Sequence, residues 1–186
     1  MGPAGEQRRV KVTTTMAIYY NEFDRGKAAW LRELMKRGAI SEGDVDERSI
    51  CDVRPDDLRG YRRCHFFAGI GLWDAALNAS GWPADREAWT GSCPCQGFSA
   101  AGKRKGFKDE RHLWPDWFKL IQSARPAIVL GEQVSSIDGL QWWDLVKSDL
   151  NAAGYAAFAS DLPACGFGAP QRRQRLYFLG ERDAST

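Results

Sequence analysis

The sequence has little of several features that identify a class of protein at once. Among its 186 residues there are only five cysteines and two histidines. No apolar run approaches the roughly 20 residues that span a bilayer. An odd number of cysteines, and an N-terminus without the apolar run of a signal peptide, argue against the disulfide framework of an exported protein. We therefore expect a reduced, cytoplasmic protein with no membrane partner.

An excess of charge is also nearly absent. Lys and Arg total 26 against 24 Asp and Glu, for a net charge of +2, so any surface that binds nucleic acid must be local. Apolar content is present: 44% of the residues are hydrophobic and 12% are aromatic, which suffices for the core of one compact domain. Residues 1–15 lack periodicity and aromatic residues, which predicts a disordered tail before a folded domain over 16–186.

Strand-like and helix-like segments alternate along this domain. Residues 26–38 are predicted to form a helix with Trp30, Leu31, Leu34 and Met35 on one face. The other expected helices are 112–126 and 139–154, and the expected strands are 16–24, 46–53, 127–134, 154–162 and 175–182. Residues 64–82 are expected to be a strand that breaks at glycines and turns into a helix. The alternation predicts an α/β fold, a mostly parallel, doubly wound sheet with helices on both faces.

Ligands of such a sheet bind where its parallel strands end. Five loops are expected at that edge: 21–24, 67–71, 93–99, 132–134 and 171–175. The search for functional residues therefore concentrates on these loops.

The 67–71 loop has Gly69 and Gly71 after a predicted strand, which permits a tight turn and a close approach by a ligand. Asp74 stands where a dinucleotide fingerprint has its third glycine, so a pyrophosphate cofactor is disfavoured. A nucleoside without phosphates, such as S-adenosylmethionine, needs the turn but not the fingerprint. Glu22 at a strand end suits ribose hydroxyls, and Asp52 suits an adenine amino group. Taken singly, each feature has an ordinary explanation. Two glycines in this spacing are as often a plain turn, and carboxylates at strand ends are usually just solvated.

The 93–99 loop contains two cysteines, which are separated only by Pro94. A zinc site needs about four ligands. Neither this spacing nor His65 and His112 supplies them, so no metal is expected. Two interpretations remain: a pair of small buried hydrophobes, or a nucleophile in which Pro94 stiffens the backbone and presents Cys95 at a strand end. A thiol of pKa ~8.5 is only partly ionised at neutral pH but is intrinsically nucleophilic.

Taken together, the motifs resemble those of the cytosine-5 DNA methyltransferases. FAGIG followed by AALNASGW is similar to the cofactor motif of that family, and GSCPCQGFSAAG to its nucleophile loop. GEQV stands where the family has Glu-Asn-Val, and APQRRQRLYFLG is similar to its Gln-x-Arg-x-Arg motif. The resemblance implies a Rossmann-like fold, S-adenosyl-L-methionine as cofactor and double-stranded DNA as partner. It further implies methylation of cytosine at carbon 5, in a prokaryotic cell or phage-infected host.

The resemblance also implies roles for individual residues. Cys95 would add to carbon 6 of cytosine, Glu132 would meet N3 and the amino group, and Arg173 and Arg175 would hold the flipped base or the nucleophile loop. The implied cofactor contacts are Phe67, Gly69, Gly71, Glu22, Asp52 and Pro94. The implied DNA contacts are Gln96, Ser99, Lys103, Arg104, Lys105 and Gln171. No chemistry is assigned to Cys93, and Cys51, Cys64 and Cys165 are expected to be packing residues.

The sequence departs from the family pattern in four ways. Gln133 replaces an asparagine, and Leu72 replaces a glycine. Only 24 residues (95 minus 71) separate Gly71 from Cys95, too few for the two strands that usually intervene. Similar segments, YYNEFD and SICDV, precede the 67–71 loop, so we expect a permuted order. No target-recognition domain is expected after residue 180.

These departures leave three alternatives to a self-sufficient methyltransferase. The chain could be a noncatalytic remnant or subunit that binds DNA, cofactor or a partner protein. It could work with a second chain that supplies target recognition. The same activation of cytosine could also accept a one-carbon unit other than methyl.

Overall fold

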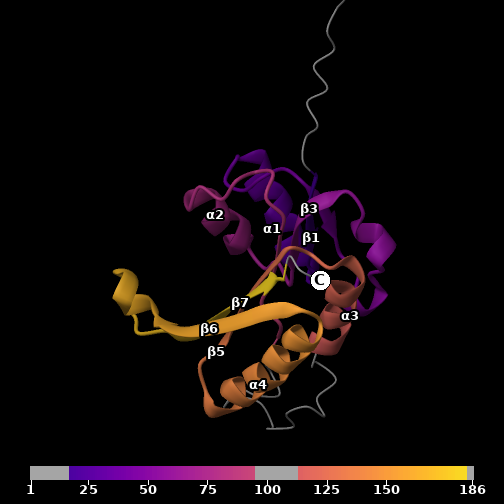
Figure 1. Ribbon diagram of the computed structural model, residues 1–186. Helices are drawn as coiled ribbons and strands as arrows, with labels where there is room; N and C mark the ends of the chain where they lie inside the picture. The colour runs from indigo at the N-terminus through magenta and orange to yellow at the C-terminus, as the bar shows by residue number, and fades with distance from the viewer. Residues whose placement is uncertain (1–16, 95–112, 184–186) are drawn as a thin grey trace, which may run out of the picture.

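A computed structural model describes residues 17–94 and 113–183 of the chain (Figure 1). The described strands form one sheet in the order β2-β1-β3-β4-β5-β7-β6, in which β7 runs antiparallel to both of its neighbours and the other paired strands are parallel. The strands are β1 (Ala17–Asn21), β2 (Asp44–Asp46), β3 (Tyr61–Phe66), β4 (Ala88–Gly91), β5 (Ile128–Val134), β6 (Tyr155–Pro163) and β7 (Gln174–Arg182).

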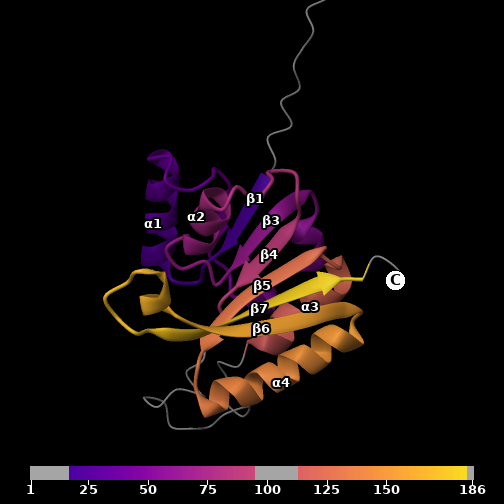
Figure 2. The same cartoon turned by 60° about the vertical axis from the view of Figure 1, so that its left-hand side comes forward.

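Four α-helices in the described residues cover the two faces of the sheet (Figure 2). They are α1 (Arg25–Lys36), α2 (Leu72–Ala79), α3 (Trp114–Ala124) and α4 (Ile137–Ala152). Residues of α1 and α2 pack with Ile18 and Tyr20 on one face, and residues of α3 and α4 pack with Tyr19 and Phe66 on the other. This alternation of side chains along β1 follows from the period of two in a strand. The predicted α/β fold, mostly parallel with helices on both faces, is confirmed.

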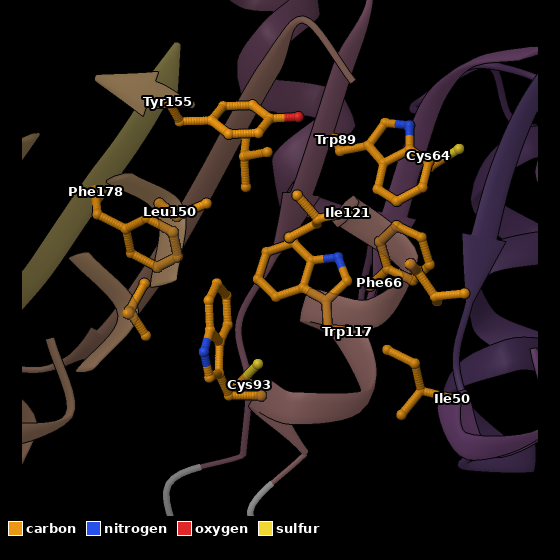
Figure 3. Packing of buried hydrophobic residues seen from close by; sticks show 14 of the residues in the cluster. Ile50, Cys64, Phe66, Trp89, Cys93, Trp117, Ile121, Leu150, Tyr155 and Phe178 are labelled. Carbon is orange, nitrogen blue, oxygen red and sulfur yellow. The ribbon is translucent and has the colours of Figure 1, made fainter. Parts of the chain in front are cut away.

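The larger core cluster is built from aromatic side chains beneath α3 and α4. Trp117 lies between Phe66 and Phe178, with ring centroids 5.8 and 6.5 Å away (Figure 3). Two glycines in the neighbouring strands make room for these rings: a Cβ atom at Gly91 would lie 2.6 Å from the Trp117 ring, and one at Gly131 would overlap Phe178. The apolar spacing that predicted α3 therefore reflects real burial.

Three details of the sequence analysis are wrong. The strand expected at 46–53 ends at Asp46, and Ile50–Asp52 form the 3-10 helix η1, because the Ser49 hydroxyl accepts a hydrogen bond from the Cys51 N–H and turns the backbone. Trp30 is 48% exposed, since no described element covers that side of α1. Of the cysteines expected to pack, Cys64 is buried, but Cys51 and Cys165 are exposed.

The two strands that precede the 67–71 turn take places beside it. β1 pairs directly with β3, with Asn21 opposite Phe66, and β2 lies outside β1 at the edge of the sheet. The permuted order stays a prediction. Of the two segments on which it rests, YYNEFD overlaps β1, whereas SICDV forms η1 and not a strand.

The β6–β7 hairpin projects beyond the rest of the sheet in both views, with the 3-10 helix η4 (Ala164–Phe167) at its tip (Figure 1, Figure 2). Pairing continues to its outer end, where Pro163 lies opposite Gln174. Within the described parts of the chain, no helix combines the length and the apolar content needed to cross a membrane.

Candidate functional site

The five expected loops lie at one edge of the sheet, as far as they are described. The register pairs Asn21 with Phe66, Phe66 with Gly91, and Gly91 with Gly131, so β1, β3, β4 and β5 point their carboxyl ends the same way. Because β7 is antiparallel, its first residues reach this edge too, with Arg175 opposite Val134. Sequence segments far apart therefore converge on one region.

The 67–71 turn has a left-handed backbone at three positions, with φ of 51° at Phe67, 59° at Gly69 and 76° at Gly71. Its two glycines serve different purposes. A Cβ at Gly71 would lie 3.1 Å from Ile40 and 3.2 Å from Leu31, inside the protein, whereas at Gly69 the nearest neighbour would be the Phe67 carbonyl oxygen at 3.9 Å. Gly69 is thus the glycine that leaves space for a ligand, and Gly71 the one that lets α1 pack closely.

Glu22 meets this turn from the end of β1. One carboxylate oxygen accepts a hydrogen bond from the Gly69 N–H at 2.7 Å, and the other accepts one from the Asp24 N–H at 2.9 Å. The side chain is nearly buried, at 7% exposure. Each oxygen keeps a second lone pair, so Glu22 both ties β1 to the turn and retains capacity to bind a hydroxyl group.

The other predicted cofactor contacts are less closely held. Asp52 ends η1 and is exposed, and among the described residues its carboxylate has no hydrogen bond or ion pair. Pro94 is exposed and is the last described residue before the gap. Phe23, which was not predicted from the sequence, is 72% exposed and directly follows Glu22 in the chain. An exposed aromatic ring beside a candidate ligand-binding carboxylate can stack on a planar group, but only the structure reveals this exposure.

Behind the turn lies a buried charged group that the sequence analysis read only as a missing glycine. Asp74 of α2 is fully buried and accepts a hydrogen bond from the Ser41 N–H at 2.7 Å. The Arg63 guanidinium lies 3.4 Å and the His65 ring 3.5 Å from its carboxylate. Burial acts to raise the pKa of Asp74, but the His65 ring and the Ser41 N–H outweigh it, so the pKa lies well below its usual range. Asp74 thereby anchors α2 to β3.

Burial acts in the opposite direction on the pKa of the neighbouring His65 imidazole. His65 is 1% exposed, and its Nδ1 lies 2.8 Å from the Thr90 hydroxyl. Removal from water lowers the pKa of His65, and this outweighs the nearby Asp74 carboxylate. His65 is therefore neutral in the folded protein near pH 7.

A cavity of about 380 Å³ joins the 67–71 turn to Glu132. Its walls come from the turn, from Trp73 and other residues of α2, from Ser92, and from Arg173 and Tyr177 of the β6–β7 hairpin. This volume falls in the range of ligand pockets, about 300–1,000 Å³. The structure thus brings together Phe67, Gly69, Glu132 and Arg173, four of the residues named by the sequence analysis.

Glu132 is held in this cavity by Arg175, whose Nε lies 2.7 Å from a carboxylate oxygen. The guanidinium also donates to the Gln174 carbonyl at 2.8 Å, which fixes its orientation. Arg173 points differently: it is exposed and has a left-handed backbone, with φ of 26°. The two arginines therefore have different surroundings, one bound to Glu132 and the other open to solvent. Gln171 is exposed as well.

Part of the predicted site lies outside the described residues: Cys95, Gln96, Ser99, Lys103, Arg104 and Lys105. Cys93 is described, and it is 5% exposed within the core cluster (Figure 3). The absence of a chemical role for it stays a prediction. In the described segments, no three or more His, Cys, Asp or Glu side chains are arranged to hold a metal ion.

Comparison with known proteins bears on this site. The C-5 cytosine-specific DNA methylase family model matches residues 74–186. The chain is 34% identical to the type II methyltransferase M.HhaI of Haemophilus parahaemolyticus, over 70% of this chain and 52% of that protein. It is also 34% identical to the type II methyltransferase M.SsoII of Shigella sonnei, over 52% of this chain and 26% of that protein. The chain therefore spans about half or less of the length of these relatives.

Solved structures support the same fold. The crystal structure of S. pombe Dnmt2 methyltransferase has a TM-score of 0.51 at 17% identity, covering 90% of this chain and 51% of that one. A Spodoptera frugiperda DNMT2 variant has a TM-score of 0.53 at 14% identity, covering 91% and 51%. The family model begins at Asp74, so β1, β2, β3 and the 67–71 turn lie outside its match. Because the match covers more than half of its residues, the chain belongs to the C-5 cytosine-specific DNA methylase family.

Proposed function

We propose that the protein transfers a methyl group from S-adenosylmethionine to carbon 5 of cytosine in DNA, through a covalent intermediate with Cys95. The observation that carries this proposal is the single cavity that contains both the 67–71 turn and Glu132. Ser92 lines the same cavity, three residues before Cys95 in the sequence. Residues 16–186 would form the catalytic domain.

The described residues suit a nucleoside cofactor at the turn. Space beside Gly69 admits a ligand close to the backbone. Glu22 has lone pairs for ribose hydroxyls, and the exposed Phe23 ring offers a face for adenine. When bound, S-adenosylmethionine would supply an electrophilic methyl group. No pyrophosphate is needed, in keeping with a turn that lacks the dinucleotide fingerprint.

On the opposite wall, the protein groups would activate the cytosine ring. The Cys95 thiolate would form a bond to carbon 6, and the electron pair of the 5,6 double bond would move toward N3, where Glu132 shares a proton and also accepts a hydrogen bond from the amino group. Carbon 5 becomes nucleophilic and would take the methyl group, and the cofactor would leave as the neutral thioether S-adenosylhomocysteine. Loss of the carbon 5 proton to a base then restores the double bond and releases the thiolate. Arg175 would hold Glu132 in place during these steps.

The target cytosine would have to leave the DNA stack to reach this cavity, as bases do in enzymes of this kind. Arg173 and Gln171, both exposed near the cavity, would contact the DNA, together with Gln96, Ser99 and the basic run from Lys103 to Lys105. Such contacts position the strand without reading its sequence. A second chain that supplies target recognition stays a prediction.

Trapping on DNA that contains 5-fluorocytosine tests the proposal, because fluorine blocks the final elimination. The wild-type protein with S-adenosylmethionine should form a complex that survives denaturing electrophoresis. Cys95→Ser should form none, and Cys165→Ser, the same change at an exposed cysteine, should trap like the wild type. Equal loss in both variants would contradict the assignment of the nucleophile.

The alternatives predict different outcomes of the same experiment. A noncatalytic binding protein would bind DNA or cofactor, measured by anisotropy and calorimetry, yet trap nothing. With a different one-carbon donor, no label would move to DNA from S-adenosylmethionine that carries a labelled methyl group.

A further inference from the structure

A second hollow, of about 430 Å³, adjoins the first beneath the tip of the β6–β7 hairpin. The two share Arg173 and Tyr177 in their walls. The rest of the second hollow is apolar, and its walls are Leu162, Pro163, Ala164, Phe167 and Ala169. The second hollow therefore borders the cavity of Glu132 across Arg173 and Tyr177, and its remaining walls are apolar.

The tip of the hairpin is an ordered loop. The Ala164 N–H donates to the Arg172 carbonyl at 2.9 Å, and the Ala169 N–H donates to the Ala164 carbonyl at 3.2 Å. Gly168 closes η4 with φ of 86°. On this fixed support the Phe167 ring is 75% exposed. Full burial of such a ring is worth about 1.5–3 kcal/mol, so its display in a hollow beside the site favours a ligand that covers it.

The surroundings indicate which ligand. Tyr177 lies directly opposite Glu132 in the register of β5 and β7, so it stands between the cytosine position and the second hollow. Arg173 borders both hollows, and Gln171 and Arg172 beside it are exposed. A guanidinium between two base-sized sites is suited to the phosphate that links two nucleotides.

We propose that the second hollow is a subsite for the nucleotide next to the target cytosine, with its base against Phe167 and its linking phosphate at Arg173. This inference rests on the proposed function, because it takes Glu132 as the position of the target base. Stacking on an aromatic ring accepts every base. The subsite therefore steadies the strand around an extruded cytosine and does not select a sequence.

A double-mutant cycle between protein and DNA tests this subsite. The probes are fluorescein-labelled duplexes with one cytosine opposite an abasic site, and with either a normal base or an abasic residue on its 5′ or its 3′ side. The proteins are the full chain, Phe167→Ala and Phe158→Ala. Phe158 is a matched control because it is 64% exposed on β6 of the same hairpin and does not line the second hollow. Thermal unfolding confirms that all three are folded.

Loss of the base on one side of the cytosine should weaken wild-type binding about tenfold by anisotropy, as expected for one stacked base. Phe167→Ala should weaken binding to the intact duplex by about the same factor and should become insensitive to the missing base. Phe158→Ala should behave like the wild type. Additive effects of Phe167→Ala and the abasic residue would overturn the proposal, as would unchanged DNA binding by Phe167→Ala, which would point to a protein partner for the hollow.

The 5-fluorocytosine experiment separates this outcome from failure of the proposed function. Coupled binding without covalent trapping would support the subsite and contradict the methyltransferase activity. Trapping without coupling would do the reverse. Absence of any DNA binding by the wild-type chain would overturn both.

Discussion

The two sides of the Glu132 cavity differ in how their polar groups are held. Behind the 67–71 turn, Glu22 is 7% exposed and Asp74 is fully buried, and both accept hydrogen bonds from backbone N–H groups. On the opposite side, the side chains of Glu132 and Arg175 are 23% and 24% exposed, and Arg173 is open to solvent. Buried carboxylates that accept hydrogen bonds from the backbone are held rigidly, whereas side chains open to solvent are held less firmly. The turn is therefore set in advance, whereas on the side proposed to meet DNA the exposed Arg173 can adjust.

Loss of a charge on the buried side should lower the free energy of unfolding more than loss of a charge at the surface. Asp74→Ala leaves the Arg63 guanidinium buried without its carboxylate, so we expect the free energy of unfolding to fall by about 3–5 kcal/mol in urea denaturation. Asp56→Ala removes an ion pair with Arg59 whose side chains are 78% and 81% exposed, and should cost less than about 1 kcal/mol. Similar losses in the two variants would remove the contrast between the sides.

Substitution of Glu132 on the open side should lower the rate of methyl transfer and leave the stability of the protein unchanged. Glu132→Gln keeps the shape of the side chain but can no longer share a proton with cytosine, so methyl transfer to DNA should fall about 100-fold or more. Calorimetry should find the affinity for S-adenosylmethionine unchanged. Glu181→Gln on the same sheet, 58% exposed, is the control and should leave both quantities unaltered. If cofactor affinity fell together with the rate, Glu132 would belong to the cofactor side.

Substitution of the two glycines of the turn should have different effects on cofactor affinity and on stability. Gly69→Ala places a methyl group in open space, so its stability cost should be limited to about 1–2 kcal/mol of left-handed strain, while cofactor affinity falls about tenfold or more. Gly71→Ala adds crowding against Ile40 and Leu31 to the same strain and should lose more stability. Calorimetry and urea denaturation measure the two effects. A larger loss of stability at Gly69 would reverse the roles given to these residues.

The smallest effect concerns pH. Because burial lowers the pKa of His65 in the folded state, the unfolded chain binds a proton more readily, and stability should fall as pH drops below the ordinary histidine value of about 6.5. His65→Gln should lose this decline in stability below about pH 6.5, measured by urea denaturation at a series of pH values. His112→Gln, at the other histidine of the chain, is the comparison. If His112→Gln lost the pH dependence of stability and His65→Gln kept it, folding would not lower the pKa of His65.

Asp74 adds to the acid sensitivity at lower pH. Its pKa is depressed in the folded state, so its contribution is complete above the unfolded value of about 3.9 and is lost only as pH falls below that. The two groups therefore act in different pH windows, which lets one titration of stability distinguish them.

Helix prediction from sequence succeeded where spacing and packing agree. In α3, Trp114, Trp117 and Ile121 recur every three or four residues, and all three are fully buried. Trp30 in α1 obeys the same spacing beside the buried Leu31, yet it is 48% exposed. Spacing identifies which side chains share a face, but the width of the covered stripe depends on the element that packs there.

Prediction of the site from sequence was likewise correct for some residues and not for others. Gly69 and Glu132 were named from motifs, and one cavity contains both. The reason given for Gly71 was a close ligand, whereas its Cβ position faces Ile40. Phe23 and Tyr177 were not named, because an aromatic residue has no motif of its own and becomes noticeable only when its neighbours are known.

The sequence by itself determined the local features: the alternation of strands and helices, the glycines that allow a left-handed turn, and the order of the family motifs. The first two depend on residues close together in the chain, and the third can be read along the sequence without a structure. Only the tertiary structure decided that Glu22 meets Gly69, 47 positions away, and that Arg175 binds Glu132 across two antiparallel strands. It also decided that Asp74 is a buried anchor. These contacts depend on strand order and register, which are set by packing across the whole sheet.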